Sequence, residues 1–270
     1  MDKKNQACPE VVKILSIGNS FSVDTMEHVA NIALSLGCKQ VKLGNLYVGG
    51  CSLNHHFYHA QGDLGAYKYY TNDGTGWQVT EGYKISDAVR SEQWDWISIQ
   101  HGTKDGSRYT LAESYEKLPA LIAHVKALAW SGAKIAFNMT WIGEPYDKHE
   151  IVLFGGDQLK MYGEVTRITQ QVVLPTAGLD RVSPTGTAIQ NARTSVLNGK
   201  LSRDGYHLSL DAGRYIAGLT FWKALTGADI ADVAWAPEGV DAIAKQIAVE
   251  SAENAIITPF AVTPSKVVTE

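Results

Sequence analysis

The 270-residue sequence has few cysteines, no excess of basic residues and no long apolar run. Its three cysteines, Cys8, Cys38 and Cys51, are too few and too scattered for a disulfide framework or a zinc knuckle. A formal net charge of −4 provides no basic surface for a phosphate backbone, so we expect no nucleic-acid partner. The apolar stretches are shorter than a membrane span, so we expect no transmembrane segment. With 45% hydrophobic and 19% charged residues, the composition is that of an ordinary globular protein.

The N-terminus does not fix the compartment of the protein. Residues 1–9 lack the apolar middle of a signal peptide, so this chain is expected to carry none. The protein is then cytoplasmic, or it is periplasmic or secreted if its N-terminus has been trimmed. Both alternatives stay open, and so does the oligomeric state.

Short apolar runs alternate along the chain with longer segments of helical periodicity. This alternation is typical of βαβ units, so we predict an α/β fold: a flavodoxin-like, three-layer α/β/α sandwich with a five-stranded parallel sheet, in a single domain over residues 1–270. The expected strands are Lys13–Ile17, Gln40–Tyr47, Trp94–Gln100, Lys134–Trp141 and Leu179–Ser183. The expected helices are Asp24–Leu36, Leu111–Ser131, Asp157–Thr176, Thr185–Leu197, Asp211–Leu225 and Pro237–Ala255.

Two segments fall outside this alternation. Residues 65–83 contain two runs of β-forming residues around an Asn-Asp-Gly turn at residues 72–74, which predicts a small inserted β-hairpin. Residues 258–270 carry Pro259 and Pro264 and are expected to form an extended tail.

The first expected strand ends in Gly18-Asn19-Ser20, and a serine at the carboxyl end of a strand is where α/β enzymes hold a nucleophile. Near the other end of the chain, Asp204 and His207 lie three positions apart. In a tight loop the Asp204 carboxylate can reach Nδ1 of His207, which leaves Nε2 to take the proton of Ser20. A simple turn at Ser20, and an Asp204 that caps a turn beside a packed His207, are the alternatives. Together the three residues predict a hydrolytic triad.

These motifs give the chain a resemblance to the SGNH (GDSL-type) hydrolases, a superfamily of esterases. Its first block is Gly-Asp-Ser, which residues 18–20 match with Asn in place of Asp, and its last block, Asp-x-x-His, is matched by residues 204–207. The chain is most similar to a branch of bacterial proteins, often from gut Bacteroidetes, of largely unknown substrate. Members of that branch begin Ile-Gly-Asn-Ser-Phe and end Asp-Gly-x-His-Leu-Ser followed by Gly-Arg-Tyr, as residues 17–21, 204–209 and 213–215 do here.

The resemblance also implies an oxyanion hole, in which the backbone N–H of Ser20 is one donor. The superfamily places a glycine after the second strand as another donor; Gly49 and Gly50 stand there, and we choose Gly50. The third block, normally Gly-x-Asn-Asp, lacks its Asn here. Gln100 is the expected substitute, because its carboxamide can donate from a longer arm, and His101 is the second choice.

Several side chains near these blocks are candidates to line the substrate site: Asn19, Gly49, His56, His101 and Trp141. Trp141 ends the fourth expected strand and could stack on a sugar ring, with core packing as the alternative. His55 and His59 have the i, i+4 spacing of helical metal ligands, but no third ligand stands nearby in the sequence, so we predict no metal site. The predicted chemistry requires no cofactor.

We therefore expect a serine esterase that hydrolyses a short-chain acyl ester, above all an acetyl ester, by a Ser-His-Asp mechanism. Its expected partner is a small-molecule or glycan ester, where the glycan rests on analogy with superfamily members that deacetylate carbohydrates. The missing Asn of the third block motivates an alternative, a non-catalytic carbohydrate-binding protein on a degenerate hydrolase scaffold. An acyl-thioester hydrolase of the same mechanism is a third hypothesis.

Overall fold

A β-sheet forms the centre of the computed structural model, which describes residues 7–102 and 108–267. Within these residues the sheet has seven strands in the order β4-β3-β2-β1-β5-β6-β7. The strands are β1 (Val11–Gly18), β2 (Gln40–Tyr47), β3 (Tyr67–Asn72), β4 (Gln78–Tyr83), β5 (Trp96–Ile99), β6 (Lys134–Asn138) and β7 (Arg181–Ser183). β1 lies in the middle of this order, so the segment after it emerges near the centre of the carboxyl edge of the sheet.

The strands β2, β1, β5, β6 and β7 run parallel, as expected, but the sheet has two strands more than the expected five. The hairpin of residues 65–83 extends the sheet, because β3 pairs antiparallel with β2 and β4 pairs antiparallel with β3. Without the hairpin, the edge of β2 would present unpaired backbone groups, and β3 satisfies them. Asn72 fixes the turn, since its Oδ1 accepts the N–H of Gly74 at 2.8 Å.

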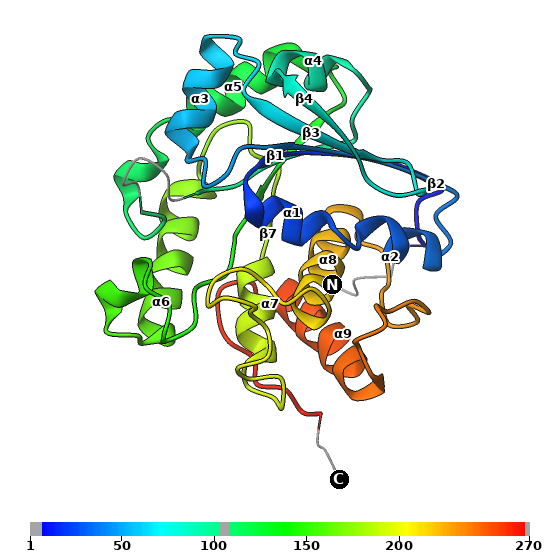
Figure 1. Ribbon diagram of the computed structural model, residues 1–270, viewed down its shortest axis with the longest axis vertical. Coiled ribbons are helices and arrows are strands. Elements are labelled where there is room, and N and C mark those ends of the chain that lie inside the picture. The colour runs from blue at the N-terminus through cyan, green and yellow to red at the C-terminus, as the bar shows by residue number, and fades with distance from the viewer. Residues whose placement is uncertain (1–6, 103–107, 268–270) are drawn as a thin grey trace.

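Helices cover both faces of the sheet (Figure 1). One face packs against α1 (Ser20–Met26), α2 (Val29–Ser35), α7 (Thr185–Ala192), α8 (Ala212–Thr226) and α9 (Ala242–Ile257). The other packs against α3 (Leu53–Gln61), α4 (Ile85–Arg90), α5 (Leu118–Leu128) and α6 (Gln158–Ile168), with the short 3-10 helices η2 (Ala112–Tyr115) and η3 (Glu150–Phe154) and the π-helix η4 (Thr169–Val173). This is the expected three-layer α/β/α sandwich. Among the described residues, no helix is both long and apolar enough to cross a membrane.

Apolar side chains that point alternately to the two faces of the sheet build a separate apolar core on each face. In β1, Ile14 packs into the core beside α1, α2 and α8, whereas Leu15 and Ile17 pack into the core beside α3, α4 and α5. All three side chains are fully buried. Successive side chains of a strand point to opposite faces, so a strand covered on both faces appears in the sequence as a nearly continuous apolar run.

The segment after β1 differs from the helix expected over residues 24–36. The structure has two helices there, and α1 begins earlier, at Ser20, because the side chain of Asn19 caps it. The expected nucleophile therefore lies in the first turn of a helix and not in a loop. The short helices α3 and α4 fall outside the expectation, since nine and six residues carry little periodic signal.

Two strands end before the residues that are expected to close them. β5 stops at Ile99 and β6 at Asn138, so residues 100–102 and 139–141 leave the sheet at its carboxyl edge. This edge is where functional groups gather in parallel α/β sheets. Further along, residues 258–267 run without helix or strand beside α7, where the Thr187 hydroxyl donates to the Pro259 carbonyl at 2.6 Å; residues 268–270 lie outside the described residues.

The close approach of α7 to the loop after β6 gives a test of the packing. A Cβ on Gly186 would overlap the carbonyl oxygen of Thr140. We expect Gly186→Ala to lower the free energy of unfolding by about 1–3 kcal/mol, because the start of α7 must move away from this loop. Gly163, in α6, has no atom within 4 Å of an added Cβ, so Gly163→Ala should raise the free energy of unfolding by up to about 1 kcal/mol. Urea unfolding measures both; shifts of the same sign would contradict the argument.

Candidate active site

Ser20 lies at the carboxyl end of β1, in the first turn of α1. The turn is tight: a Cβ on Gly18 would meet Ser22 Oγ at 2.7 Å. Asn19 has an extended backbone (φ −134°), and its Oδ1 accepts the N–H of Phe21 at 2.9 Å, which satisfies one of the open donors at the helix start. The Gly-Asn-Ser sequence thus ends the strand, caps the helix and holds the serine hydroxyl at the edge of the sheet.

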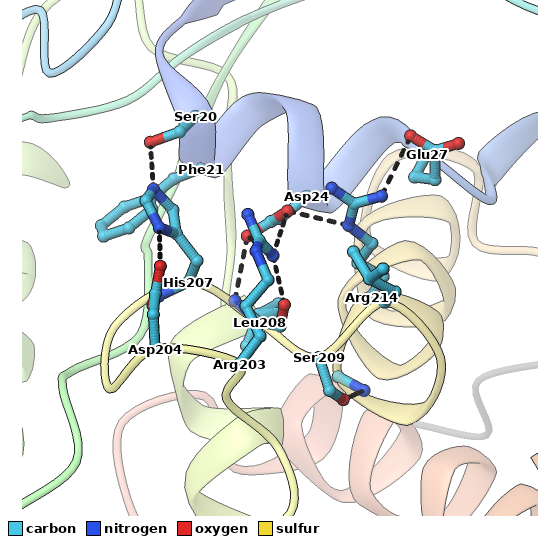
Figure 2. A network of polar contacts seen from close by, with 12 residues as sticks. Ser20, Phe21, Asp24, Glu27, Arg203, Asp204, His207, Leu208, Ser209 and Arg214 are labelled. Carbon is cyan, nitrogen blue, oxygen red and sulfur yellow. Dashed lines mark hydrogen bonds and ion pairs between the residues drawn. The ribbon is translucent and has the colours of Figure 1, made fainter. Parts of the chain in front are cut away.

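Ser20, His207 and Asp204 form one hydrogen-bonded chain (Figure 2). Ser20 Oγ lies 2.8 Å from His207 Nε2, and His207 Nδ1 lies 2.6 Å from Asp204 Oδ2. The fold therefore brings together a serine and a histidine that are 187 positions apart. In this arrangement the carboxylate holds the proton of Nδ1, and Nε2 can accept the proton of the hydroxyl.

The loop around Asp204 holds its carboxylate as an anion. Burial raises the pKa of Asp204, but hydrogen bonds from the His207 ring and from the backbone N–H groups of His207 and Tyr206 outweigh it and lower the pKa below its ordinary value. Asp204 Oδ1 accepts these two N–H groups at 2.8 and 3.2 Å. Gly205 takes a left-handed φ of 103°, which lets the chain turn within three residues. An ionised Asp204 keeps a proton on Nδ1 of His207.

Asp24, expected only as the acidic first residue of a helix, is a fully buried carboxylate one helical turn after the serine. Its oxygens accept hydrogen bonds from Arg203 Nη1 (3.0 and 3.1 Å), Arg214 Nε (2.8 Å) and the N–H of Leu208 (2.9 Å) (Figure 2). Arg203 and Leu208 flank the loop of the Asp-His pair, and Arg214 lies in the first turn of α8. The buried carboxylate therefore fastens that loop to the helix of the serine.

Asn19 and Gln100 join three strand ends behind the serine. Gln100 is 2% exposed and donates from Nε2 to Asn19 Oδ1 at 2.7 Å. Asn19 Nδ2 donates to the carbonyl oxygens of Cys51 (3.2 Å) and His101 (3.4 Å). Gly102, which sequence reasoning does not select, leaves room for these contacts, because a Cβ there would overlap the Cys51 carbonyl. Gln100 thus positions Asn19, and its role as an oxyanion donor stays a prediction.

Two pockets meet at Ser20. The larger has a volume of about 530 Å³ and the smaller a volume of about 240 Å³. Ser20, Gly50 and Tyr206 line both pockets, and His207 lines the larger one. Gly50 has a left-handed φ of 60°, a conformation that favours glycine at the point where the pockets join.

Tyr206 and His149 reach the pockets although the sequence analysis does not select them. The ring centroid of Tyr206 lies 3.9 Å from that of His207 and 4.2 Å from that of His149. His149 Nδ1 lies 2.6 Å from Asp147 Oδ1, so a second imidazole with a carboxylate partner lines the smaller pocket. The place of Tyr206 inside the Asp-x-x-His block is the one signal that could have indicated it.

Three candidate pocket residues, His56, His101 and Trp141, are buried and line neither of the two pockets that meet at Ser20. Burial lowers the pKa of His56 to about 3, and its Nδ1 lies 2.8 Å from the hydroxyl oxygen of Tyr67. Trp141 donates its indole N–H to the carbonyl oxygen of Tyr206 at 2.6 Å. A polar or aromatic residue near a motif can support a pocket from beneath, and Trp141 does so.

The remaining candidates divide between the pockets and α3. Gly49 lines the larger pocket and Asn19 the smaller one. His55 and His59 lie on α3 with their ring centroids 6.2 Å apart. Within residues 7–102 and 108–267, no three His, Cys, Asp or Glu side chains gather into a group that could hold a metal ion.

Comparisons with known proteins place this chain in a family. A family model described as a domain of unknown function (DUF4886) matches residues 13–255. A DUF4886 family protein from Bacteroides uniformis is 32% identical, with a TM-score of 0.89 over 96% of this chain and 100% of that one. No curated protein matches the chain.

Two more distant structures share the fold. One is an acetyl xylan esterase from Geobacillus stearothermophilus, 15% identical, with a TM-score of 0.54 over 83% of this chain and 98% of that one. The other is a lipase/acylhydrolase from Enterococcus faecalis, 14% identical, with a TM-score of 0.53 over 80% of this chain and 96% of that one. These similarities confirm the predicted SGNH-like hydrolase fold.

The contacts of Asp24 predict how much this carboxylate contributes to the stability of the protein. Asp24→Asn would leave two guanidinium groups facing an amide in a buried place, so we expect a loss of about 3 kcal/mol in the free energy of unfolding. Glu27→Gln is the matched control: Glu27 lies 3.4 Å from Arg214 and is 32% exposed, so its loss should stay below about 1 kcal/mol. Urea unfolding at neutral pH compares the two variants, and equal losses would contradict the assigned role of Asp24.

Proposed function

The chain belongs to the DUF4886 family, and we propose that it is a serine esterase that hydrolyses a short-chain acyl ester, above all an acetyl ester. The observation that carries the proposal is the hydrogen-bonded chain from Ser20 Oγ through His207 to Asp204, at 2.8 and 2.6 Å. Its position at the carboxyl edge of the sheet, beside two pockets, supports a catalytic use of the hydroxyl.

In the proposed reaction, Ser20 Oγ attacks the ester carbonyl while His207 Nε2 accepts the hydroxyl proton. Asp204 stabilises the imidazolium that forms. His207 then gives this proton to the departing alkoxide oxygen, which leaves as an alcohol and leaves the acyl group on Ser20. A water molecule enters, His207 removes its proton, and collapse of the second intermediate returns the proton to Ser20 and releases the acid.

The negative charge of each intermediate needs donors close to Ser20. We assign the backbone N–H groups of Ser20 and Gly50 to this task, because Gly50 borders both pockets and its φ of 60° lets the backbone approach the reacting carbonyl. Gln100 is the proposed third donor. Its Nε2 carries two hydrogens. One is donated to Asn19 Oδ1, and we assign the other to the oxyanion.

The two pockets suggest how the ester lies. His207 must protonate the leaving oxygen, and it lines the larger pocket, so the alcohol part belongs there. The acyl part then enters the smaller pocket, between Asn19 and Tyr206. This pocket has less than half the volume of the other, so it suits the smaller part of an ester that joins a short acyl chain to a larger alcohol.

A carbohydrate on the alcohol side is consistent with the walls of the larger pocket. Tyr47, Tyr70 and Tyr206 line it, and aromatic faces of this kind stack on sugar rings. An acetyl xylan esterase has a similar fold, which adds an analogy but no residue-level support. We therefore propose an acetylated glycan or a smaller sugar ester as the substrate.

The contact between Gln100 and Asn19 also favours a second candidate, the non-catalytic carbohydrate-binding protein. If Gln100 serves only to hold Asn19, the site lacks the side-chain donor that the third block normally provides. Such a protein would bind a glycan with unchanged affinity after Ser20→Ala and would turn over no ester. A thioesterase of the same mechanism would differ only by its preference for acyl thioesters over oxygen esters.

We expect p-nitrophenyl acetate to be hydrolysed faster than the butyrate, and the butyrate faster than the octanoate, because the acyl part is assigned to the smaller of the two pockets. Ser20→Ala should lower kcat by a factor on the order of 10⁴ to 10⁶. Release of p-nitrophenol measures both effects. Ser35→Ala, which removes a serine hydroxyl on α2 away from the pockets, is the matched control and should retain full activity. Equal activity of Ser20→Ala and wild type would refute the serine mechanism.

The role of Gln100 can be measured separately. If its carboxamide donates to the oxyanion, Gln100→Ala should lower kcat by about 10² to 10³ with little change in KM. Asn19→Ala and the double variant complete a cycle with the same substrate. A double variant no slower than Asn19→Ala alone would show that Gln100 acts only through Asn19.

A further inference from the structure

The larger pocket carries positive charge that the proposed hydrolysis does not require. Its described lining residues include the cations Lys68 and Arg203 and no carboxylate, although the whole chain has a net charge of −4. Neither cation belongs to the hydrogen-bonded chain of Ser20. Besides their ion pairs with Glu81 and Asp24, Lys68 and Arg203 face the alcohol side of the site, which favours an anionic ligand there.

Arg203 is held at one nitrogen and remains open at the others. Its Nη1 donates to both oxygens of Asp24, at 3.0 and 3.1 Å, and to the carbonyl oxygen of Leu208. Among the described residues, Nε and Nη2 make no hydrogen bond, and the side chain is 33% exposed. Because Nη1 is anchored, the rest of the planar guanidinium is fixed in orientation, which suits recognition of a planar or tetrahedral anion.

Lys68 comes to the same pocket from the hairpin. It lies in β3 directly opposite Tyr47 of β2, and the Tyr47 and Tyr70 rings pack beside it with centroids 6.0 Å apart. Its ammonium pairs with Glu81 of β4 at 2.9 Å, but the side chains are 48% and 70% exposed. An ion pair so open to water contributes little, so Lys68 can turn from Glu81 to an anion in the pocket at small cost.

We propose that the alcohol part of the ester carries an anionic group, a carboxylate in the first instance, which Lys68 and Arg203 bind. The substrate class is thus an acyl ester of an acidic sugar or of another acidic alcohol. This inference rests on the proposed function for the direction in which the ester lies. The protein would then select its ester by the charge of the leaving alcohol as well as by the length of the acyl chain.

Two esters with the same acyl group test the proposal: para-acetoxybenzoate and its neutral analogue para-acetoxybenzamide. We expect kcat/KM of the wild-type protein to be about tenfold higher for the carboxylate. A third ester, para-acetoxybenzenesulfonate, separates the two kinds of anion. A preference for either anion over the amide supports the proposal, and their order distinguishes a carboxylated from a sulfated alcohol. Measurable and equal kcat/KM values for all three esters would overturn it.

The matched variants are Lys68→Glu and Lys42→Glu. Lys42 is 49% exposed and pairs with Glu92 at 2.8 Å, but it lies outside the pocket lining. Lys68→Glu should reduce the preference for the carboxylate to about one or below, whereas Lys42→Glu should keep it. Retention of the preference in Lys68→Glu would overturn the proposal that Lys68 and Arg203 bind the anion. Arg203 is unsuited to this test because it also holds Asp24.

Binding to the Ser20→Ala protein separates this inference from the esterase proposal. Isothermal titration with para-acetoxybenzoate and para-acetoxybenzamide measures affinity without turnover. Tighter binding of the carboxylate supports the anion site even if the wild-type protein hydrolyses neither ester, a result that would contradict the esterase alone. Equal affinities overturn the anion site, whatever the activity.

Discussion

The candidate site depends on one buried carboxylate. Asp24 accepts hydrogen bonds from two guanidinium groups and a backbone N–H, and it has no contact with solvent. A buried charge is tolerated only with such partners, so the positions of Arg203 and Arg214 relative to α1 are fixed. The hydrogen bond between Ser20 and His207 joins segments from opposite ends of the chain, and Asp24 holds these segments together independently of that bond.

A second set of polar contacts acts on the other side of the serine. Asn19 links the end of β1 to the segments that follow β2 and β5, through the carbonyl oxygens of Cys51 and His101 and the side chain of Gln100. The parts of the site therefore come from several strand ends, and these hydrogen bonds fix them relative to one another. These hydrogen bonds hold Asn19 and Gln100 in place behind Ser20.

The sequence was sufficient to predict the layers of the fold and the segments that meet at the sheet edge, because both depend on local patterns. Apolar runs and helical spacing indicated the parallel strands, and the Gly-Asn-Ser and Asp-x-x-His motifs indicated Ser20 and His207. The partners of Asp24, the pairing of the hairpin with β2 and the burial of His56 and Trp141 depend on contacts between distant segments. A side chain near a motif has the same local sequence whether it faces a pocket or supports one from below.

The pairing of β3 with β2 places one wall of the larger pocket on a strand that carries none of Ser20, Asp204 and His207. Tyr67 and Tyr69 are buried in the core, while Lys68 and Tyr70 line the larger pocket, since alternate side chains of a strand face opposite ways. A change of one residue in the length of the 62–66 connection would exchange the two faces of β3 and replace the pocket wall. The hairpin lies at the sheet edge and carries none of Ser20, Asp204 and His207, so the side chains of this pocket wall can change while the hydrogen-bonded chain of Ser20 stays the same.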